Sequence, residues 1–292
     1  MLDKVVVALG YFDSVHIGHE KVINEAVSYA KKVNAKVVVF TFSGNLRAFF
    51  KGETEKQIYT ANEKEKIMLS LGVSEVFFAP VNKTFLNKGR VSFLNYVNKK
   101  YNVTAYVCGE DYTFGKNAKG NVSFLKDYAI KNNQNVITVL EERFNGEKIS
   151  TSKIKSHLKN GEVDRANELL GRAYSICGKV YKDRGVGMKI GFPTANVKVD
   201  AKKQALKNGV YAGKVLVDNK EYNAIINYGA RPTFRLSEII LEAHLFDFNA
   251  NLYGKTIEVY FEKFIRDVLT FSSKDELISQ IEKDVKKAKG II

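Results

Sequence analysis

The segment that most constrains the fold of this chain is a strand, a turn and a helix within residues 4–32. Residues 4–9 are apolar and mostly β-branched, which predicts a buried strand. Beyond the turn, apolar residues recur at helical spacing: Val22, Ile23, Ala26, Val27 and Ala30. A strand that passes through a short turn into a helix is the unit of a doubly wound α/β sheet. Its turn offers backbone N–H groups and a helix N-terminus to an anion.

The turn itself, residues 10–19, reads Gly-Tyr-Phe-Asp-Ser-Val-His-Ile-Gly-His. His16 and His19 are three positions apart, so on a first helical turn they share one face. Gly10 allows a tight turn, and Gly18 lets a phosphate approach the backbone. Two imidazoles can donate hydrogen bonds to phosphate oxygens as a transition state gains charge, which suits nucleotidyl transfer from ATP to a phosphorylated acceptor. Two ordinary histidines at a helix start are the weaker alternative, because half of the chain's 4 histidines stand here.

Composition limits the number of domains, the cellular compartment and the kinds of partner that we expect. The 292 residues leave room for two domains, and the two cysteines, Cys108 and Cys177, give no disulfide framework, which favours a reducing compartment. The first strand begins near the N-terminus and no stretch reaches the roughly 20 apolar residues of a membrane span, so we expect a cytoplasmic protein without a membrane partner. The net charge of +14 is spread along the chain, and we expect no nucleic-acid partner.

The first half of the chain alternates strands with helices. Further buried strands are predicted over residues 36–42, 75–79, 103–108 and 136–140, and helices over residues 60–71 and 91–100. Strands separated by helices imply a parallel sheet. A turn-rich loop at residues 115–120 follows the strand that ends at Cys108, on the side where such sheets bind ligands. Asp111 is therefore a site candidate.

The pattern changes after a helix predicted over residues 164–170. Short alternating runs follow, at residues 175–181, 209–217, 221–228, 238–246 and 255–264. Such spacing predicts an antiparallel β-barrel, which an amphipathic helix at residues 273–289 would close. We therefore expect two domains, residues 1–172 and 173–292.

A helix predicted over residues 149–158 begins with a cluster of hydroxyl side chains that includes Thr151 and Ser152. Lys153 and Lys155 follow on its first turn. Hydroxyls, free N–H groups and lysines together form a possible phosphate site. A plain helix start with exposed lysines explains the pattern equally well.

A second constellation of polar residues lies in the barrel region. Within Gly191-Phe-Pro-Thr-Ala-Asn196, Thr194 and Asn196 are two apart on an extended segment and point the same way, which suits a magnesium site shared with phosphate and water. Residues 227–233 predict a turn-rich segment. Further on, Glu242 is one of the alternate residues of a strand that face one way, and its carboxylate could serve as a general base for a hydroxyl. An exposed glutamate on a barrel strand is the alternative, and spacing alone does not choose between them.

Five segments together resemble the bacterial bifunctional riboflavin kinase/FMN adenylyltransferase family, also called FAD synthetases. They are residues 10–19, 107–115, 149–155, 191–196 and 227–248 with 252–254 after it, and their order is the family's order. The resemblance implies phosphorylation of riboflavin to FMN by the barrel domain and adenylylation of FMN to FAD, with release of pyrophosphate, by the first domain. Its substrates and products would be ATP and the flavins, with Mg²⁺ as cofactor, in a monomer or weak oligomer.

The resemblance also implies roles for single residues. In the barrel, Thr194 and Asn196 would bind magnesium, Thr194 and Gly191 the nucleotide and Arg266 the flavin, with Glu242 as the base. In the first domain, His16 and His19 would stabilise the transferred phosphoryl group and Asp111 would contact flavin. The predicted nucleotide-binding residues there are Gly10, Phe12, Asp13, Gly18, Thr151, Ser152 and Lys155.

Departures from the family pattern keep other interpretations open. Lys155 stands where arginine is usual, and Asn45-Leu46 replaces a His-Pro pair, which suggests an alternative in which only the kinase is active. Ser14 stands where glycine is usual, and Met188 replaces a frequent arginine. Two less favoured alternatives involve RNA: a synthetase-like enzyme built on the His-x-Gly-His signature, and an RNA-binding regulator.

Overall fold

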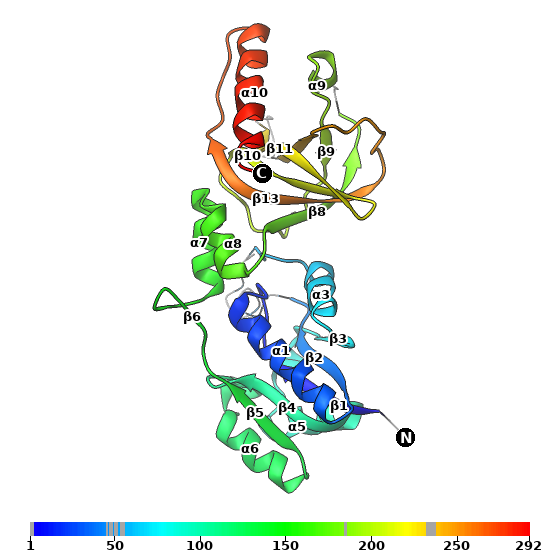
Figure 1. Ribbon diagram of the computed structural model, residues 1–292. Helices are drawn as coiled ribbons and strands as arrows, with labels where there is room; N and C mark the ends of the chain where they lie inside the picture. Colours follow the sequence, from blue (N-terminus) through cyan, green and yellow to red (C-terminus); the bar gives the residue numbers. More distant parts are fainter. Residues whose placement is uncertain are drawn as a thin grey trace. The chain divides into compact units, whose positions relative to one another are not determined.

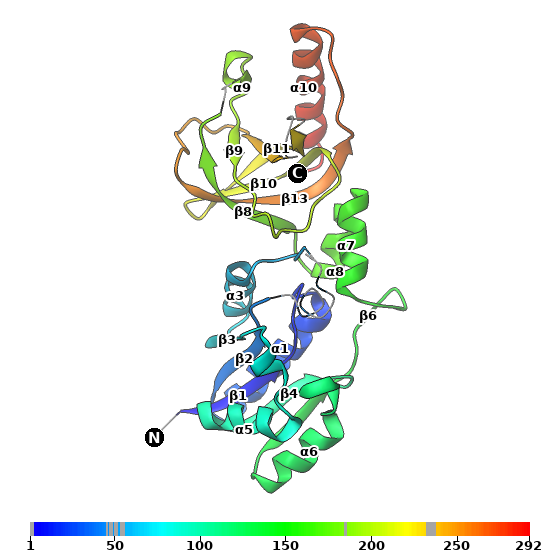
Figure 2. The ribbon, with the colours of Figure 1, turned by 180° about the vertical axis from the view of Figure 1, so that it is seen from behind.

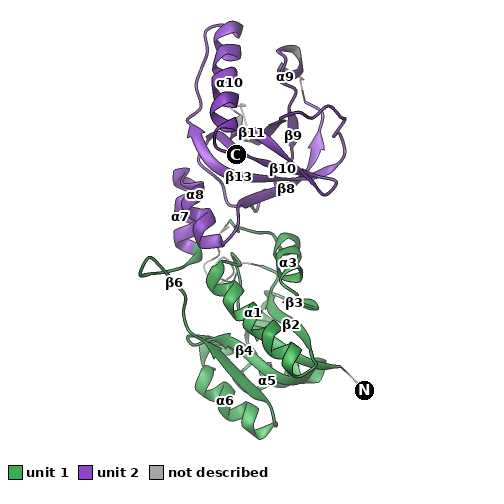
Figure 3. Cartoon of the chain, in the orientation of Figure 1, with its two compact units in different colours: residues 1–151 green, residues 152–292 purple. Residues whose placement is uncertain are grey.

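The computed structural model describes residues 3–44, 46, 49, 52, 56–183, 186–231 and 238–292 (Figure 1). Asn45, which motivates the kinase-only alternative, lies outside the described residues, as do Pro232 and Thr233 of the predicted turn-rich segment. The chain divides into two compact units, Met1–Thr151 and Ser152–Ile292 (Figure 3).

The first unit is built on a parallel sheet, as predicted. In the described part of the chain its strands are β1 (Lys4–Leu9), β2 (Lys36–Phe42), β3 (Glu75–Ala79), β4 (Asn102–Gly109) and β5 (Asn135–Val139). They pair in the order β3-β2-β1-β4-β5. From β1 the chain adds β2 and β3 on one side of β1, and it then adds β4 and β5 on the other side. The carboxyl ends of β1 and β4 therefore form the switch point at which such sheets bind ligands.

Helices cover both faces of this sheet because alternate strand residues point to opposite sides. Val6 and Ala8 of β1 pack with α1 (Ile17–Lys32) and α3 (Ala61–Ser70), whereas Val7 packs with α5 (Arg90–Lys100) and α6 (Val122–Lys131). Figure 1 shows α1 in front of the sheet and Figure 2 shows α5 on the other side. The helices α4 (Lys83–Leu86) and α6 had not been predicted.

A short hairpin leads out of this unit. The strands β6 (Arg143–Phe144) and β7 (Glu147–Lys148) are joined by Asn145 and Gly146, whose φ values of 50° and 80° suit a two-residue hairpin turn. The helices α7 (Thr151–Asn160) and α8 (Val163–Leu170) follow. The buried side of α8 packs against the barrel, and Asn167 donates a hydrogen bond to the carbonyl of Phe261.

The second unit contains the predicted antiparallel barrel. Its strands close in the order β10-β11-β12-β9-β8-β13. They are β8 (Tyr174–Tyr181), β9 (Ala195–Val197), β10 (Gly209–Val217), β11 (Lys220–Arg231), β12 (Glu238–Leu245) and β13 (Thr256–Arg266). The expected turn at residue 227 was wrong, because β11 continues through Asn227 to Arg231. The short helix α9 (Val186–Lys189) and the three-residue β9 had not been predicted.

The C-terminal helix α10 (Lys274–Lys289) packs on the outside of the barrel, as predicted. Ala288 of α10 joins a buried apolar cluster with Ala212 of β10 and Ile225 of β11. Inside the barrel, large aromatic side chains fill the core: Tyr174, Tyr211, Tyr228 and Phe261. Because these side chains fill the interior, a ligand site of the barrel has to lie on its outer face, beside α10.

Two candidate active sites

The first candidate site lies at the switch point of the parallel sheet. A pocket of about 210 Å³ is lined from β1, the following turn, the start of α1 and the end of β4. Its lining includes six residues predicted from the sequence: Gly10, Phe12, His16, Gly18, His19 and Asp111. Asp13, also predicted to bind nucleotide, is 4% exposed and is absent from that lining.

The two histidines lie against each other at the start of α1. Their ring centroids are 3.7 Å apart and their planes differ by 10°. Nδ1 of His16 accepts a hydrogen bond from the backbone N–H of His19 at 3.2 Å, so His16 is the N-cap of the helix. With Nδ1 occupied as an acceptor, Nε2 of His16 is the nitrogen that can donate to a substrate oxygen.

Backbone strain shapes the turn that precedes these histidines. Phe12 and Val15 have φ values of 45° and 43°, a left-handed conformation that is unusual for any side chain and rare for a β-branched one. Both side chains are buried. A Cβ at Gly10 would lie 2.5 Å from the Phe12 ring, so glycine is required there by close approach. Such strain persists only where the surrounding structure holds it, and it is common at functional sites.

Charged side chains are part of the lining of this pocket: Glu110, Asp111, Glu141, Glu142 and Lys148. Nζ of Lys148 lies 2.6 Å from Glu141 and 3.3 Å from Asp111, and Lys21 pairs with Glu142 at 2.5 Å. The hydrogen bonds to Glu141 and Asp111 raise the pKa of Lys148. Both carboxylates and the lysine reach solvent, so these pairs are weak and can exchange partners cheaply.

A larger aromatic pocket adjoins the first one. It measures about 590 Å³ and shares Tyr11, Asp111 and Tyr112 with the histidine pocket. Its remaining wall includes four phenylalanine rings: Phe42, Phe85, Phe93 and Phe114. Asp111 was predicted from the sequence but this pocket was not, because its four phenylalanine rings come from four separate segments.

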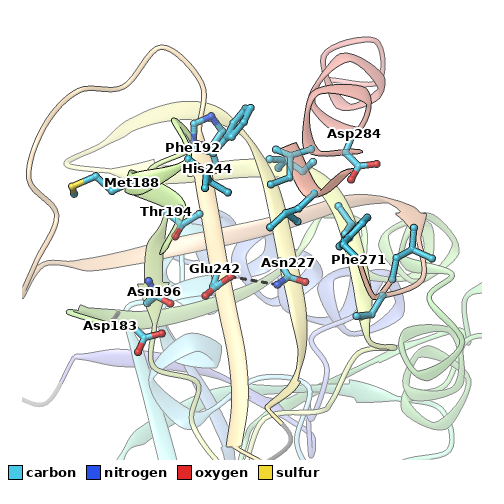
Figure 4. Close-up of a pocket in the computed structure, with 18 of the residues that line it drawn as sticks. Asp183, Met188, Phe192, Thr194, Asn196, Asn227, Glu242, His244, Phe271 and Asp284 are labelled. Atoms are coloured by element: carbon cyan, nitrogen blue, oxygen red, sulfur yellow. Dashed lines mark hydrogen bonds between the residues drawn. The ribbon is translucent and has the colours of Figure 1, made fainter. Parts of the chain in front are cut away.

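The second candidate site is a pocket of about 450 Å³ on the outer face of the barrel. Four polar side chains that face one another come from β9, β11, β12 and the segment before β9 (Figure 4): Thr194, Asn196, Asn227 and Glu242. Apolar residues complete the lining, from the strands (Val210, Ile225), from α10 (Leu277, Ile281) and from the segment before α10 (Val268, Leu269, Phe271).

Strand register brings Glu242 to the centre of this group. It is paired with Asn227 of β11 on one side and with Asn196 of β9 on the other. Nδ2 of Asn227 donates to Oε2 of Glu242 at 3.4 Å. The predicted alternation is confirmed, because Leu241, Ala243 and Leu245 are buried whereas Glu242 lines the pocket.

The oxygen donors here fit a magnesium ion that is shared with phosphate. Oδ1 of Asn196 is buried and accepts no hydrogen bond from the residues that the structure describes. Thr194 lines the same pocket. Neutral and carboxylate oxygens suit Mg²⁺, which keeps waters and takes phosphate ligands. Among the described residues no group of three His, Cys, Asp or Glu side chains could hold a metal without such help.

A second pocket, of about 370 Å³, meets the first at Thr194. It shares Met188, Thr194 and Tyr253 with the larger one. His244 fixes the segment between them, because its Nδ1 lies 2.8 Å from the carbonyl of Pro193. Gly191, predicted to bind nucleotide, lines neither pocket, and its φ of 87° shapes the preceding loop.

Arg266 lines the larger pocket but its guanidinium is engaged. Nε and NH2 donate to the carboxylate of Asp284 on α10 at 2.9 and 2.6 Å. The pair therefore ties β13 to the helix that forms one wall of the pocket. The contact between Arg266 and flavin stays a prediction.

The third group of predicted residues begins at the end of the first unit. The hydroxyl of Thr151 lies 3.0 Å from that of Ser14, the residue of the first motif that departs from the family pattern. Ser152 and Lys155 follow on α7, in the second unit. Their part in nucleotide binding stays a prediction.

A parallel sheet with paired histidines at its switch point, followed by a barrel that bears a carboxylate and oxygen donors, is the arrangement of a two-site transferase of phosphorus-containing groups. Family models agree: one described as FAD synthetase matches residues 1–153, and one described as riboflavin kinase matches residues 170–292. Residues 154–169 lie between these ranges, so the domain boundary predicted at residue 172 stays a prediction.

The chain is 36% identical to the bifunctional riboflavin kinase/FMN adenylyltransferase of Bacillus subtilis, with 98% of this chain and 92% of that protein covered. It is 35% identical to the Buchnera aphidicola enzyme of the same name, covering 96% and 91%. A crystal structure from Streptococcus pneumoniae, described as a macrolide-efflux protein, matches with a TM-score of 0.89 at 31% identity, covering 98% and 94%. No helix in the described part of this chain is long and apolar enough to cross a membrane.

The chain belongs to the bifunctional riboflavin kinase/FMN adenylyltransferase family. It is a transferase of flavin-cofactor synthesis with an FAD synthetase domain followed by a riboflavin kinase domain. The presence of both domains favours the bifunctional interpretation over the kinase-only alternative.

Proposed function

We propose that the two reactions proceed at separate pockets, one in each compact unit. The observation that supports this is that each pocket has its own reactive groups: His16 and His19 in the first, Glu242 with Thr194 and Asn196 in the second. ATP and riboflavin would give FMN at the barrel, and FMN with a second ATP would give FAD at the parallel sheet.

Adenylyl transfer at the first pocket needs no general base. A phosphate oxygen of FMN attacks the α-phosphorus of ATP, a new P–O bond forms, and pyrophosphate leaves with the electron pair of the broken bond. The nucleophile is already anionic at neutral pH. His16 and His19 donate N–H groups to the oxygens that gain charge, and the N-terminus of α1 supports the same charge.

The flavin ring of FMN would bind in the aromatic pocket. This pocket is continuous with the histidine pocket through Tyr11 and Tyr112, so a flat ring held there would send its phosphate toward His19. Asp111 lines both pockets and would contact FMN where the ring meets its side chain. Phe93 and Phe114 supply apolar faces for stacking.

Lys148 supplies positive charge to a pocket that also has four carboxylates: Glu110, Asp111, Glu141 and Glu142. ATP and FMN bring several negative charges, which these carboxylates would repel. Because the pairs of Lys148 with Glu141 and Asp111 are solvent-exposed, the ammonium can turn to a substrate phosphate at small cost.

Phosphoryl transfer at the barrel pocket requires a base, because the attacking group is a hydroxyl. The 5′-hydroxyl of riboflavin attacks the γ-phosphorus of ATP, Glu242 accepts its proton, and ADP leaves. The apolar wall beside α10 would hold the flavin ring, and the smaller adjoining pocket would hold the nucleotide. Thr194 belongs to both linings, so the γ-phosphate would lie there. Thr194 and Asn196 would hold a magnesium ion, which supplies charge neutralisation to the phosphates.

The remaining expectations concern the partners, the cellular location and the oligomeric state of the protein. Riboflavin, FMN and ATP would be the partners, with no nucleic acid and no membrane, in a cytoplasmic monomer or weak oligomer. The substrates and the oligomeric state are carried over from the family. The even spread of basic residues argues against nucleic acid, and the two free cysteines favour a reducing compartment.

The test is to incubate the purified protein with riboflavin, ATP and magnesium and to separate riboflavin, FMN and FAD by chromatography, then to repeat from FMN. FMN followed by FAD supports both sites. FMN that accumulates without FAD in both experiments would leave the kinase alone active. Loss of both reactions on changing either Glu242 or His19 in a folded protein would contradict the separation of the sites.

A further inference from the structure

One buried charge in the first unit has no part in the chemistry described above. Lys64 lies on α3 and is 2% exposed. It stands four positions before Met68, on the face of the helix that packs against the sheet, where the helical period calls for an apolar side chain. Burying an ammonium group is unfavourable, so its partners must compensate for the lost hydration.

The partners of Lys64 belong to the end of β2 and to the signature turn. Nζ donates a hydrogen bond to the carbonyl of Phe42, the last residue of β2, at 3.3 Å. It lies 5.8 Å from the ring centroid of Tyr11 and 5.7 Å from that of Phe78. Burial lowers the pKa of Lys64, and the charge of the buried Asp13 opposes that shift.

The same turn is fixed to β2 by backbone contacts. Gly10 N donates to the Phe40 carbonyl at 3.3 Å, and the hydroxyl of Thr41 donates to the Tyr11 carbonyl at 2.6 Å. Between Tyr11 and His16 lie the two strained residues, Phe12 and Val15. A charge that faces Asp13 between them therefore acts on the part of the chain that sets the direction of the histidines.

We propose that Lys64 is a positioning residue for adenylyl transfer, which holds the strained turn against the end of β2 and thereby orients His16 and His19. The inference rests on the proposed placement of adenylyl transfer at these histidines. A purely structural lysine would be replaceable here by an apolar side chain of the same length, often with no loss of stability. A positioning lysine would not be, because a small displacement of the reacting groups can lower a rate about a hundredfold.

The experiment compares Lys64→Met with Lys66→Met, an exposed lysine on the same helix, and with Lys64→Arg. Lys64→Met should lower kcat for FAD formation from FMN about tenfold to a hundredfold, with little change in KM for ATP. Its melting temperature and its riboflavin kinase rate should match the wild type. Lys66→Met should behave as wild type, and Lys64→Arg should recover most of the rate.

A pH profile separates charge from packing. The titratable side chains of the turn that face Lys64 are Asp13 and Tyr11, whereas β2 faces it with a carbonyl and β3 with Phe78. With its pKa lowered, Lys64 loses its charge at a lower pH than an ordinary lysine. Wild-type FAD formation should therefore fall at alkaline pH, and Lys64→Arg should keep its rate to higher pH because arginine stays protonated.

Two results would overturn the inference: a Lys64→Met variant with a normal FAD rate, or one whose rate and melting temperature fall together without recovery in Lys64→Arg. The His19→Ala variant shows whether such a result means that the role of Lys64 is wrong or that adenylyl transfer does not take place at the histidines. If His19→Ala abolishes FAD formation while Lys64→Met does not alter it, the site stands and the role of Lys64 is wrong. If His19→Ala leaves FAD formation intact, the site itself is wrong.

Discussion

The hydroxyl groups of Ser14 and Thr151 lie 3.0 Å apart, although 137 positions separate them along the chain. Ser14 is fully buried within the strained turn, and Thr151 is the first residue of α7. This contact joins the segment that bears the two histidines to the hydroxyl cluster that was predicted to bind phosphate. The serine that departs from the family pattern thus has a specific partner.

Replacing Ser14 with alanine should weaken this junction. Loss of this partly buried hydrogen bond, which leaves Thr151 without its Ser14 partner, costs about 1 kcal/mol. We expect a lower melting temperature and slower FAD formation, with FMN formation unchanged. Ser156→Ala, at an exposed position of α7, is the control. Equal effects of both changes would show that the contact contributes nothing.

Replacing Glu242 with glutamine keeps the shape of the side chain and removes the base. FMN formation should fall by about two to four orders of magnitude, since a general base contributes that much. Conversion of FMN to FAD should continue at its normal rate. Glu282→Gln, at an exposed position of α10, should leave both rates unchanged. Normal FMN formation in the Glu242 variant would exclude this carboxylate as the base.

Replacing His19 with alanine should have the reverse effect. Removing one donor to a developing charge lowers a rate about a hundredfold to a thousandfold, so FAD formation should be nearly lost. Riboflavin phosphorylation should continue. His157, which pairs with Glu162 on the following segment, provides the control substitution to alanine. A kinase rate that fell in parallel would argue for general misfolding.

Replacing Asp284 with asparagine breaks the pair that ties α10 to β13. Asp284 is 3% exposed, and removing one partner of a buried ion pair destabilises by about 3 kcal/mol or more because a charge is left uncompensated. The apolar wall formed by Leu277 and Ile281 would loosen, so KM for riboflavin should rise. Asp275→Asn, exposed on the same helix, tests whether any lost carboxylate has this effect.

The two cysteines should differ in reactivity. Burial raises the pKa of Cys108 to about 12, so its thiol stays protonated and unreactive at neutral pH in the folded protein. Cys177 is partly exposed. A thiol reagent should therefore modify one cysteine quickly, and Cys177→Ser should abolish that reaction until the protein unfolds. Fast labelling of Cys108 would contradict its burial.

The same shift gives a dependence of stability on pH. A thiol whose pKa is raised on folding stays protonated while the unfolded chain already ionises. The free energy of unfolding should fall as the pH rises from about 9, the ordinary value, toward 12. Cys108→Ala should remove this part of the alkaline slope, which chemical denaturation at several pH values would measure.

Elements with a strong internal period were predicted to within three residues. The bounds of β3 and β10 agree fully, and α10 begins one residue later than expected because Ser273 is its N-cap. The strand β9 was missed since three residues give no period. The turn expected at Asn227 was wrong because the register with β12 extends β11 through it.

Local sequence patterns were sufficient to predict the alternation of strands and helices, the change to a barrel and the chemistry of its motifs. These depend on neighbouring residues: a period of two or 3.6, a cap, or a histidine pair on one helical turn. The contacts between distant groups, in contrast, depend on the tertiary fold. Strand register set Asn227 beside Glu242, the return of the chain set Thr151 beside Ser14, and the docking of α3 buried Lys64 beneath the turn. Such contacts join distant segments, and they form only because packing of the whole domain offsets the entropy of bringing those segments together.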